Sequence, residues 1–437
     1  MRVLQFGNVA QNGYNNAKLL RRIGIEADAV CDESQALAQP EWEDAQLPVD
    51  VDAMAPWTGV SVEGWQRPDW VIAPRVPPRR PPGYYRAAYG AALAANAPRL
   101  RRLYADLRRE FAPIRGELGT HLTFGDVLAG YRSTWMHSIV LGDVASLFRR
   151  YDLVQAYATH PILTLVATPD RPFVAYEHGT LRELPFEPSW RGRLLSLSYR
   201  RAAKVIITNA DVVSSARRLG LENTRFIPHP VDETKYTPGH SAVGEELRAA
   251  GAGPVFFAPA RQDWREKRSD VMVRALGRLV QAGHPNAVLL LGDWGADVSR
   301  TRALVDELGL ARNVHWTKPV PKLRLIELYR AADVVLDQFT FGTFGGIAPE
   351  AMACERPVVM AFDRALHDWC FPEPPPIVDA RDEQSVAEAL RRLADDPAER
   401  QRLGREGRAW VERHHGWRLV AERQRAVYEE VLTPRTV

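Results

Sequence analysis

The sequence predicts an α/β protein of two doubly wound domains that face each other across a cleft. Short apolar runs alternate with helical segments in two separate series, and 437 residues are too many for one ordinary domain. A polar stretch interrupted by prolines, residues 229–246, separates the two series. We therefore predict an N-terminal domain at 1–236 and a C-terminal domain at 237–415, with a last helix at 416–437 that packs back on the first domain.

The first series opens with a βαβ unit. "RVLQF" is a buried strand, a glycine turn and a helix ending at Gly24 follow it, and "IEADAVC" is the next strand. After an irregular region at 40–140, strands resume with "DLVQAYA", "PFVAYEHGT" and "KVIITNA". Ligands of such sheets bind beyond the carboxyl ends of the strands, which places His160, His178 and Asn209 on one rim.

The second series has the same alternation and is more regular. Its predicted strands are "PVFFAPA", "AVLLLGD", "NVHWT", "DVVLDQF" and "RPVVMAF". Helices are expected at 269–282, 298–308 and 322–331 between them, and the tail is helical to Leu432.

Composition excludes several classes of protein. Lys and Arg number 57 against 54 acids, which argues against a dedicated nucleic-acid binder. The three cysteines show neither metal-ligand spacing nor close pairing, so we expect free thiols. No apolar run is long enough for a membrane span, and the first residues are typical of a buried strand and not of a signal peptide. We therefore expect a cytoplasmic protein.

Residues 75–115 carry ten arginines and only two acids, together with four tyrosines. Two interpretations stay open. The arginines can form the solvated face of helices whose tyrosines and leucines face the core. Alternatively, the segment is a surface for an anionic or lipid-linked acceptor, or for peripheral contact with an acidic membrane.

A glycine-rich segment, "FTFGTFGGIAPEAMACERPVV" from Phe339 to Val359, follows a strand and leads into a helix. Glycines let backbone N–H groups approach a ligand, and Pro349 suits a first helical turn, so the segment favours an anion such as a diphosphate. Glu350 can then accept hydrogen bonds from ribose hydroxyls. The alternative is an ordinary glycine turn in which Glu350 complements the helix dipole.

This segment resembles the signature of the family 4 retaining glycosyltransferases of the GT-B fold, in which a Glu-x7-Glu motif precedes Ala-Met-Ala and Pro-Val-Val. The second glutamate falls on Glu350, which the resemblance makes the ribose ligand. The first falls on Gly342, so this chain is an atypical member without the glutamate that contacts the donor sugar in the family. The resemblance implies two Rossmann-like domains and a nucleoside-diphosphate sugar as donor.

The same resemblance assigns the other site residues. "PARQDWREK" matches the segment whose Arg and Lys hold the donor diphosphate, here Arg261 and Lys267, and "YEHG" places His178 at the reacting centre. The alternative interpretation, without the resemblance, is that Arg261 and Lys267 are ordinary surface charges and that His178 has a structural role. The remaining expected donor contacts are Asn12, Gly13, Gly292, Trp316, Thr317, Gly345, Gly346 and Ile347.

The predicted function is retaining transfer of a sugar to a hydroxyl of a glycan, glycolipid or natural-product scaffold. Cationic side chains stabilise the leaving diphosphate, so we expect neither a metal nor a cofactor, and no Asp-x-Asp pair precedes the site within the C-terminal domain. Two alternatives remain: a nucleotide-sugar epimerase or hydrolase of the same fold, and a nucleotide-sugar-binding protein without catalysis, which the glycine at position 342 suggests.

Overall fold

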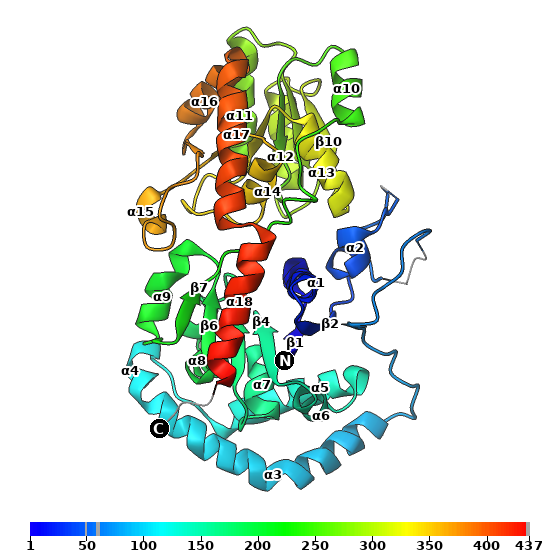
Figure 1. The fold of residues 1–437 in the computed structure, drawn as a ribbon, viewed down its shortest axis with the longest axis vertical. Helices are drawn as coiled ribbons and strands as arrows, with labels where there is room; N and C mark the ends of the chain where they lie inside the picture. The colour runs from blue at the N-terminus through cyan, green and yellow to red at the C-terminus, as the bar shows by residue number, and fades with distance from the viewer. Residues whose placement is uncertain (49, 58–61, 434–437) are drawn as a thin grey trace.

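The computed structural model describes residues 1–48, 50–57 and 62–433 and has two lobes, each built on one parallel β-sheet (Figure 1). The first sheet has seven strands and the second has six. Helices cover both faces of each sheet, so the predicted fold class, two doubly wound α/β domains, is confirmed. The chain passes from one sheet to the other between Phe226 and Val255.

The N-terminal sheet has the strand order β3-β2-β1-β4-β5-β6-β7, with every pair parallel. Its strands are β1 (Arg2–Phe6), β2 (Glu26–Val30), β3 (Val71–Ile72), β4 (Leu153–Tyr157), β5 (Phe173–Tyr176), β6 (Lys204–Ile207) and β7 (Thr224–Phe226). The central strands β4 and β5 are buried along their whole length, because helices cover the sheet on both sides.

Nine helices of this domain lie before the second sheet begins, within the part of the chain that the structure describes. They are α1 (Asn12–Arg22), α2 (Pro40–Asp44), α3 (Tyr84–Phe111), α4 (Arg115–Leu118), α5 (Phe124–Leu141), α6 (Val144–Arg149), α7 (Pro161–Ala167), α8 (Trp190–Arg201) and α9 (Val213–Arg218). Helices α3, α5, α7 and α8 pack together on one face of the sheet, and α1 packs on the other.

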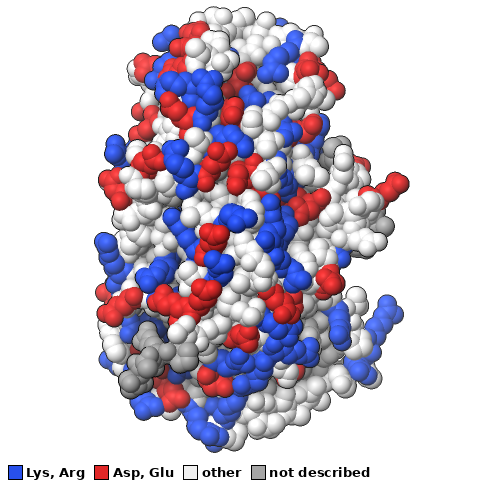
Figure 2. All heavy atoms as spheres, in the orientation of Figure 1, with Lys and Arg blue, Asp and Glu red and all other residues white. Residues whose placement is uncertain are grey.

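The basic region forms the long helix α3 along the outer edge of the N-terminal lobe, where Figure 2 shows basic side chains. Its inner face buries Leu100, Leu103, Leu107 and Phe111. Nine of the ten arginines are exposed, and Arg99 is partly buried with a hydrogen bond to the Ala167 carbonyl. This arrangement matches the solvated-face interpretation. Among the described residues, no helix is both long and apolar enough to cross a bilayer.

The C-terminal sheet has the order β10-β9-β8-β11-β12-β13, again all parallel. Its strands are β8 (Val255–Ala258), β9 (Val288–Gly292), β10 (Val314–Thr317), β11 (Val334–Leu336), β12 (Val358–Met360) and β13 (Val378–Asp379). Its helices are α10 (Ala242–Ala249), α11 (Ser269–Gln281), α12 (Val298–Glu307), α13 (Lys322–Ala331), α14 (Ile347–Ala353), α15 (Arg364–His367), α16 (Glu383–Asp395) and α17 (Pro397–His414).

The last helix, α18 (Trp417–Leu432), runs from the C-terminal lobe onto the N-terminal one, where it packs beside α1 (Figure 1). Buried amides fix it there. Gln424 donates to Asn16 Oδ1 at 2.8 Å, and its own Oε1 accepts from Gln155 at 3.2 Å. The hydroxyl of Tyr428 donates to Gln155 at 2.9 Å. Buried polar groups must be hydrogen-bonded, and a shift of α18 along the domain would leave these amides without partners. The hydrogen bonds therefore fix the position of α18.

Candidate functional site

The carboxyl ends of the two sheets lie opposite each other, and a cavity of about 380 Å³ opens between the lobes. Residues following β5 line one wall, including Gly179 and Arg182. Arg265, Glu266 and residues of the glycine-rich segment line the other. The Arg182 guanidinium lies 6.0 Å from the Phe341 ring across this cavity. None of the predicted site residues itself lines this cavity, but its walls come from the segments that contain His178, Lys267 and the glycine-rich stretch.

Glu350 is held in place by two side chains of α13. Lys322 Nζ donates to Oε1 at 2.6 Å, and the Tyr329 hydroxyl donates to Oε2 at 3.0 Å. Burial and the neighbouring carboxylate raise the pKa of Tyr329 well above its usual value, so this hydroxyl stays protonated and keeps donating. The side chain of Glu350 is 15% exposed, which leaves its remaining lone pairs for a ligand hydroxyl.

The two glycines closest to Glu350 in the sequence, Gly345 and Gly346, have open space beside their Cα atoms. An added Cβ at Gly345 would meet no atom within 4 Å, and one at Gly346 only the Glu350 carboxylate, so neither glycine is required by packing. In the described chain, no backbone hydrogen bond engages the N–H groups of these two residues. Ile347 begins α14 directly after them. The segment therefore presents open amides beside the Glu350 carboxylate.

Lys267 lies in the connection between β8 and α11, and its Nζ is 3.7 Å from Asp337 Oδ1. The side chain of Asp337 is only 3% exposed. Burial raises the pKa of this carboxyl, and Lys267 partly offsets that rise. The Lys267 carbonyl accepts from the Phe339 amide at 3.3 Å, so the lysine and the glycine-rich segment are joined directly.

Arg261 lies in the same connection, where Glu266 accepts a hydrogen bond from its guanidinium. Its Nε is also 3.4 Å from Asp263 Oδ2, and its side chain is 39% exposed. Arg268, where the family has a glycine, adopts a left-handed conformation with φ 55°. The structure places both predicted cations in the connection that follows β8, with Lys267 facing Asp337 just after β11.

On the N-terminal side, His178 follows β5 and its Nε2 donates to the Val9 carbonyl at 2.9 Å. Asn12 Nδ2 lies 2.9 Å from the same ring nitrogen, and Asn12 Oδ1 accepts from His229 Nδ1 at 3.0 Å. Burial lowers the pKa of His178, so its imidazole is neutral. A neutral ring that donates from Nε2 has a lone pair on Nδ1, which can accept a hydrogen bond from a substrate hydroxyl.

Gly13 has a packing role that sequence reasoning missed. An added Cβ there would lie 2.2 Å from the Gly7 carbonyl oxygen, so only glycine lets α1 begin this close to the end of β1. Ala10 and Gln11, just before this helix, have φ values of 48° and 63°. The structure places Gly13 next to Asn12 at this rim, and its predicted contact with the donor stays a prediction.

Gly292, Trp316 and Thr317 meet at the ends of β9 and β10. Thr317 is the register partner of Gly292, and its carbonyl accepts from the Asp293 amide at 2.7 Å. The Arg302 guanidinium lies 4.2 Å from the centre of the Trp316 ring. An added Cβ at Gly292 would lie 2.7 Å from the Ala260 carbonyl, so the β8 connection packs against this strand end. The structure brings these three residues together, and their predicted contact with the donor stays a prediction.

Sequence reasoning did not find several polar residues of this region: Glu177, Asp211, His229, Lys322, Tyr329 and Asp337. Asn209, predicted on the rim, donates to the buried carboxylate of Glu177 at 3.3 Å. Burial raises the pKa of Glu177. Asp211 accepts two hydrogen bonds from Arg182, which fixes the guanidinium at the cavity. These contacts join residues from different elements, so no local spacing indicates them.

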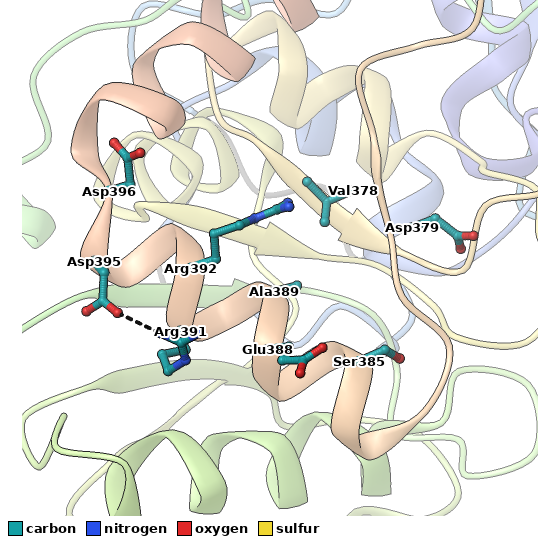
Figure 3. A pocket seen from close by; sticks show the side chains of 9 residues that line it. All are labelled: Val378, Asp379, Ser385, Glu388, Ala389, Arg391, Arg392, Asp395 and Asp396. Atoms are coloured by element: carbon teal, nitrogen blue, oxygen red, sulfur yellow. Dashed lines mark hydrogen bonds and ion pairs between the residues drawn. The ribbon is translucent and has the colours of Figure 1, made fainter.

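A second hollow, of about 600 Å³, lies at the edge strand β13 beside α16 (Figure 3). Its wall carries acidic and basic side chains, and Arg391 pairs with Asp395 within it. Asp379 already accepts from the Phe362 amide and pairs with Arg381. Its lining residues lie in β13, α16 and the segment after α16, and none of them belongs to a segment predicted to bind the donor, so we do not assign the site there.

Comparisons with known proteins agree with this geometry. Residues 249–410 match the family model described as glycosyl transferases group 1. The chain is 28% identical over 319 residues to a D-inositol 3-phosphate glycosyltransferase of Corynebacterium jeikeium, covering 68% of this chain and 71% of that protein. It is 31% identical over 268 residues to the Acidothermus cellulolyticus protein of the same name, covering 53% and 57%.

Two solved structures have the same fold along nearly the whole chain. One is Anabaena Alr3699/HepE in complex with UDP, with a TM-score of 0.61, 15% identity and coverage of 98% of this chain and 100% of that one. The other is sucrose-phosphate synthase from Thermosynechococcus elongatus, with a TM-score of 0.61, 17% identity and 99% coverage of both.

Proposed function

We propose that the chain is a family 4-like glycosyltransferase of the GT-B fold, and that it transfers a sugar from a nucleoside-diphosphate sugar to an acceptor hydroxyl with retention of configuration. One observation carries the proposal. The Glu350 carboxylate, held by Lys322 and Tyr329, lies beside the open amides of Gly345 and Gly346. This arrangement suits a ribose next to a diphosphate.

The two cations act on the leaving group. As the bond between the sugar and the diphosphate breaks, negative charge grows on the departing oxygen. Lys267 is already in position, and Arg261 exchanges Glu266 for a phosphate oxygen when the donor binds. Pre-placed cations stabilise this charge with little rearrangement, so the proposed step requires no metal ion at the diphosphate. Titration with Mg²⁺ is expected to leave kcat unchanged.

The transfer itself is proposed to occur on one face of the sugar. The acceptor hydroxyl oxygen bonds to the anomeric carbon as the carbon–oxygen bond to the diphosphate breaks. The hydroxyl proton passes to the departing phosphate oxygen. His178 accepts a hydrogen bond from a donor-sugar hydroxyl through Nδ1 and orients the ring. Closure of the lobes excludes water that would otherwise hydrolyse the donor.

The relatives suggest the first substrates to test. UDP-sugars are the first donors, because the Anabaena structure contains UDP. A phosphorylated polyol is the first acceptor, because relatives are named as D-inositol 3-phosphate glycosyltransferases. A thermal-shift screen with UDP-, GDP-, ADP- and dTDP-sugars identifies the donor, since a ligand that binds the native state raises Tm.

Incubation with the donor alone, and then with acceptors, tests the reaction. The proposal predicts little product without acceptor and a glycoside with the donor's anomeric configuration when acceptor is added, as read by NMR. Fast hydrolysis or epimerisation of the donor alone would instead favour the alternative enzyme. Binding of the donor without any turnover would favour the non-catalytic alternative, for which the missing glutamate at Gly342 is the specific observation.

A further inference from the structure

Three side chains with metal-binding atoms meet at the carboxyl rim of the N-terminal sheet, outside the proposed donor site. Asp32 follows β2, His160 immediately precedes α7, and His137 lies on α5. Asp32 Oδ2 is 2.9 Å from His160 Nε2 and 3.5 Å from His137 Nε2. The three ligand atoms lie within 4.8 Å of one another.

Backbone carbonyls orient both imidazoles. His160 Nδ1 is 3.0 Å from the Tyr157 carbonyl, and His137 Nδ1 is 2.8 Å from the Ser133 carbonyl. Each Nδ1 must donate there, which leaves the Nε2 lone pair of a neutral ring directed at Asp32. Metal-binding histidines are oriented in the same way, by an outer hydrogen bond from the second nitrogen.

The surroundings bury Asp32 and His160 and leave His137 partly exposed. The His160 ring packs edge-on against Phe6, with centroids 5.2 Å apart, and an added Cβ at Gly7 would lie 2.7 Å from its Nδ1. The side chain of Asp32 is 7% exposed. Its Oδ1 is buried and has no hydrogen-bond partner among the described residues. Such an atom costs free energy unless a further ligand satisfies it.

Three acceptor atoms that converge repel one another unless protons or a cation lie between them. One proton on His160 can serve its contact with Asp32, but it leaves the Nε2 of His137 and the second oxygen of Asp32 without a donor. A divalent cation satisfies all of these lone pairs together. Two imidazoles and one carboxylate form the ligand set of many zinc sites, in which a fourth position stays open.

We propose that Asp32, His137 and His160 bind one divalent ion of the zinc class. Asp32 also lines a cavity of about 640 Å³ in the N-terminal domain, and the wall of this cavity includes Arg67 and Arg75. The open coordination position would be available to an oxygen ligand from that side. This site is separate from the diphosphate site of the C-terminal domain, and it departs from the sequence expectation of no metal.

Zinc binding by the untagged full chain tests the proposal without any substrate. After dialysis against a chelating resin, the chain is titrated with Zn²⁺ in competition with a chromophoric chelator. We expect one ion per chain. Asp32→Asn, His137→Gln and His160→Gln should each weaken binding by more than the roughly 10–100-fold that loss of an outer-shell partner causes. His284→Gln is the matched control, because His284 pairs with Asp395 alone at 3.1 Å.

Two measurements on the wild-type chain keep the test independent of variant folding. The Co²⁺-loaded chain should show the visible absorption of a tetrahedral site, and Zn²⁺ should raise Tm until a chelator is added. Absence of both signals, or unchanged zinc affinity in folded Asp32→Asn and His137→Gln, would overturn the proposal. The cluster would then be an ion pair of His160 with Asp32, neighboured by His137.

Discussion

At the scale of single residues, the predicted site residues differ in how much hydrogen-bonding capacity they have left for a ligand. Glu350 is positioned by partners that leave lone pairs free, and Lys267 faces one buried carboxyl. Arg261 is different, because an exposed neighbour, Glu266, accepts its hydrogen bond. Exposed ion pairs are weak, so a diphosphate can displace this partner at little cost.

Replacing Glu350 by Ala should lower donor affinity or turnover at least tenfold, a change of about 1.4 kcal/mol or more. The ribose loses its acceptor, and Lys322 loses its partner. Steady-state kinetics with calorimetric titration of the donor measure the effect. Glu388→Ala, at an exposed position of α16, is the control and should behave as wild type. Unchanged kinetics in Glu350→Ala would remove the ribose assignment.

Arg261→Ala should reduce kcat more than it raises KM, because its partner gains charge only in the transition state. Arg391→Ala, which removes an exposed arginine paired only with Asp395, should leave both constants unchanged. A rise in KM at constant kcat would instead mean that Arg261 contributes to donor binding alone.

At the scale of elements, the geometry of the glycine-rich segment favours glycine at position 342, where the resemblance to the family places a glutamate. Gly342 has φ +67°, and an added Cβ would lie 2.9 Å from Asp363 Cβ and 3.3 Å from its backbone nitrogen. Any other residue there is strained and crowded. The segment has therefore taken a path in which glycine, and not glutamate, fits position 342.

Restoring the family residue should consequently fail. Gly342→Glu is expected to destabilise the chain by about 1–3 kcal/mol, seen as a lower Tm, and to bring no gain in turnover. Gly342→Ala should also lower Tm. Gly345→Ala should have little effect on it, because its added Cβ meets no atom within 4 Å. A Gly342→Glu variant as stable as wild type would contradict the strained geometry.

Much of the fold could be predicted because each domain repeats one local pattern. The expected helix 322–331 is α13, and the expected helix 269–282 differs from α11 by one residue. For the region 40–140, the sequence predicts helical stretches but not their bounds. Its main element, α3, has a weak apolar period because an alanine-rich first half and Pro98 interrupt it. Packing of the second half of α3 against the rest of the domain stabilises the helix, and these tertiary contacts cannot be predicted from the local sequence.

The candidate site divides in the same way. Glu350 and Lys267 lie in short segments with a recognisable local sequence, so they can be predicted from a motif. Lys322 and Tyr329 belong to the site only because α13 packs beside α14. Asp32 and His160 are 128 residues apart, and no spacing rule connects them.

At the scale of the whole molecule, the two lobes are joined by buried groups around the connection between them. Lys235 donates to Glu43 at 2.7 Å and pairs with Asp44 at 3.2 Å, which ties this connection to α2. Although Glu43 is buried, Lys235 and further lysines lower its pKa to about 2. His415 donates from Nδ1 to the His229 carbonyl at 2.9 Å, beside the bridge between Val231 and Gly416.

This connection should make the protein sensitive to acid. Burial lowers the pKa of His415 to about 4, so the native state keeps the ring neutral while the unfolded state binds a proton below about pH 6.5. Stability is therefore full above pH 6.5 and falls as the pH drops towards 4. Between pH 7 and pH 5 the loss is on the order of 1–2 kcal/mol, measured as a fall in Tm.

His415→Phe removes the titrating ring and should make Tm less dependent on pH over this range, whatever its value at pH 7. Phe344, Phe371 and Trp410 surround the ring, so a phenyl group fits among them. An equally steep fall in this variant would show that other groups carry the acid sensitivity, with His229 the first to examine, because burial also lowers its pKa.

A crystal structure of the chain with a nucleoside diphosphate tests the central claim most directly. The account predicts that Lys267 Nζ contacts the diphosphate, that the amides of Gly345 and Gly346 donate to it, and that the ribose hydroxyls bond to Glu350. A diphosphate bound elsewhere, with Lys267 still facing Asp337 and Glu350 without a ligand, would contradict it.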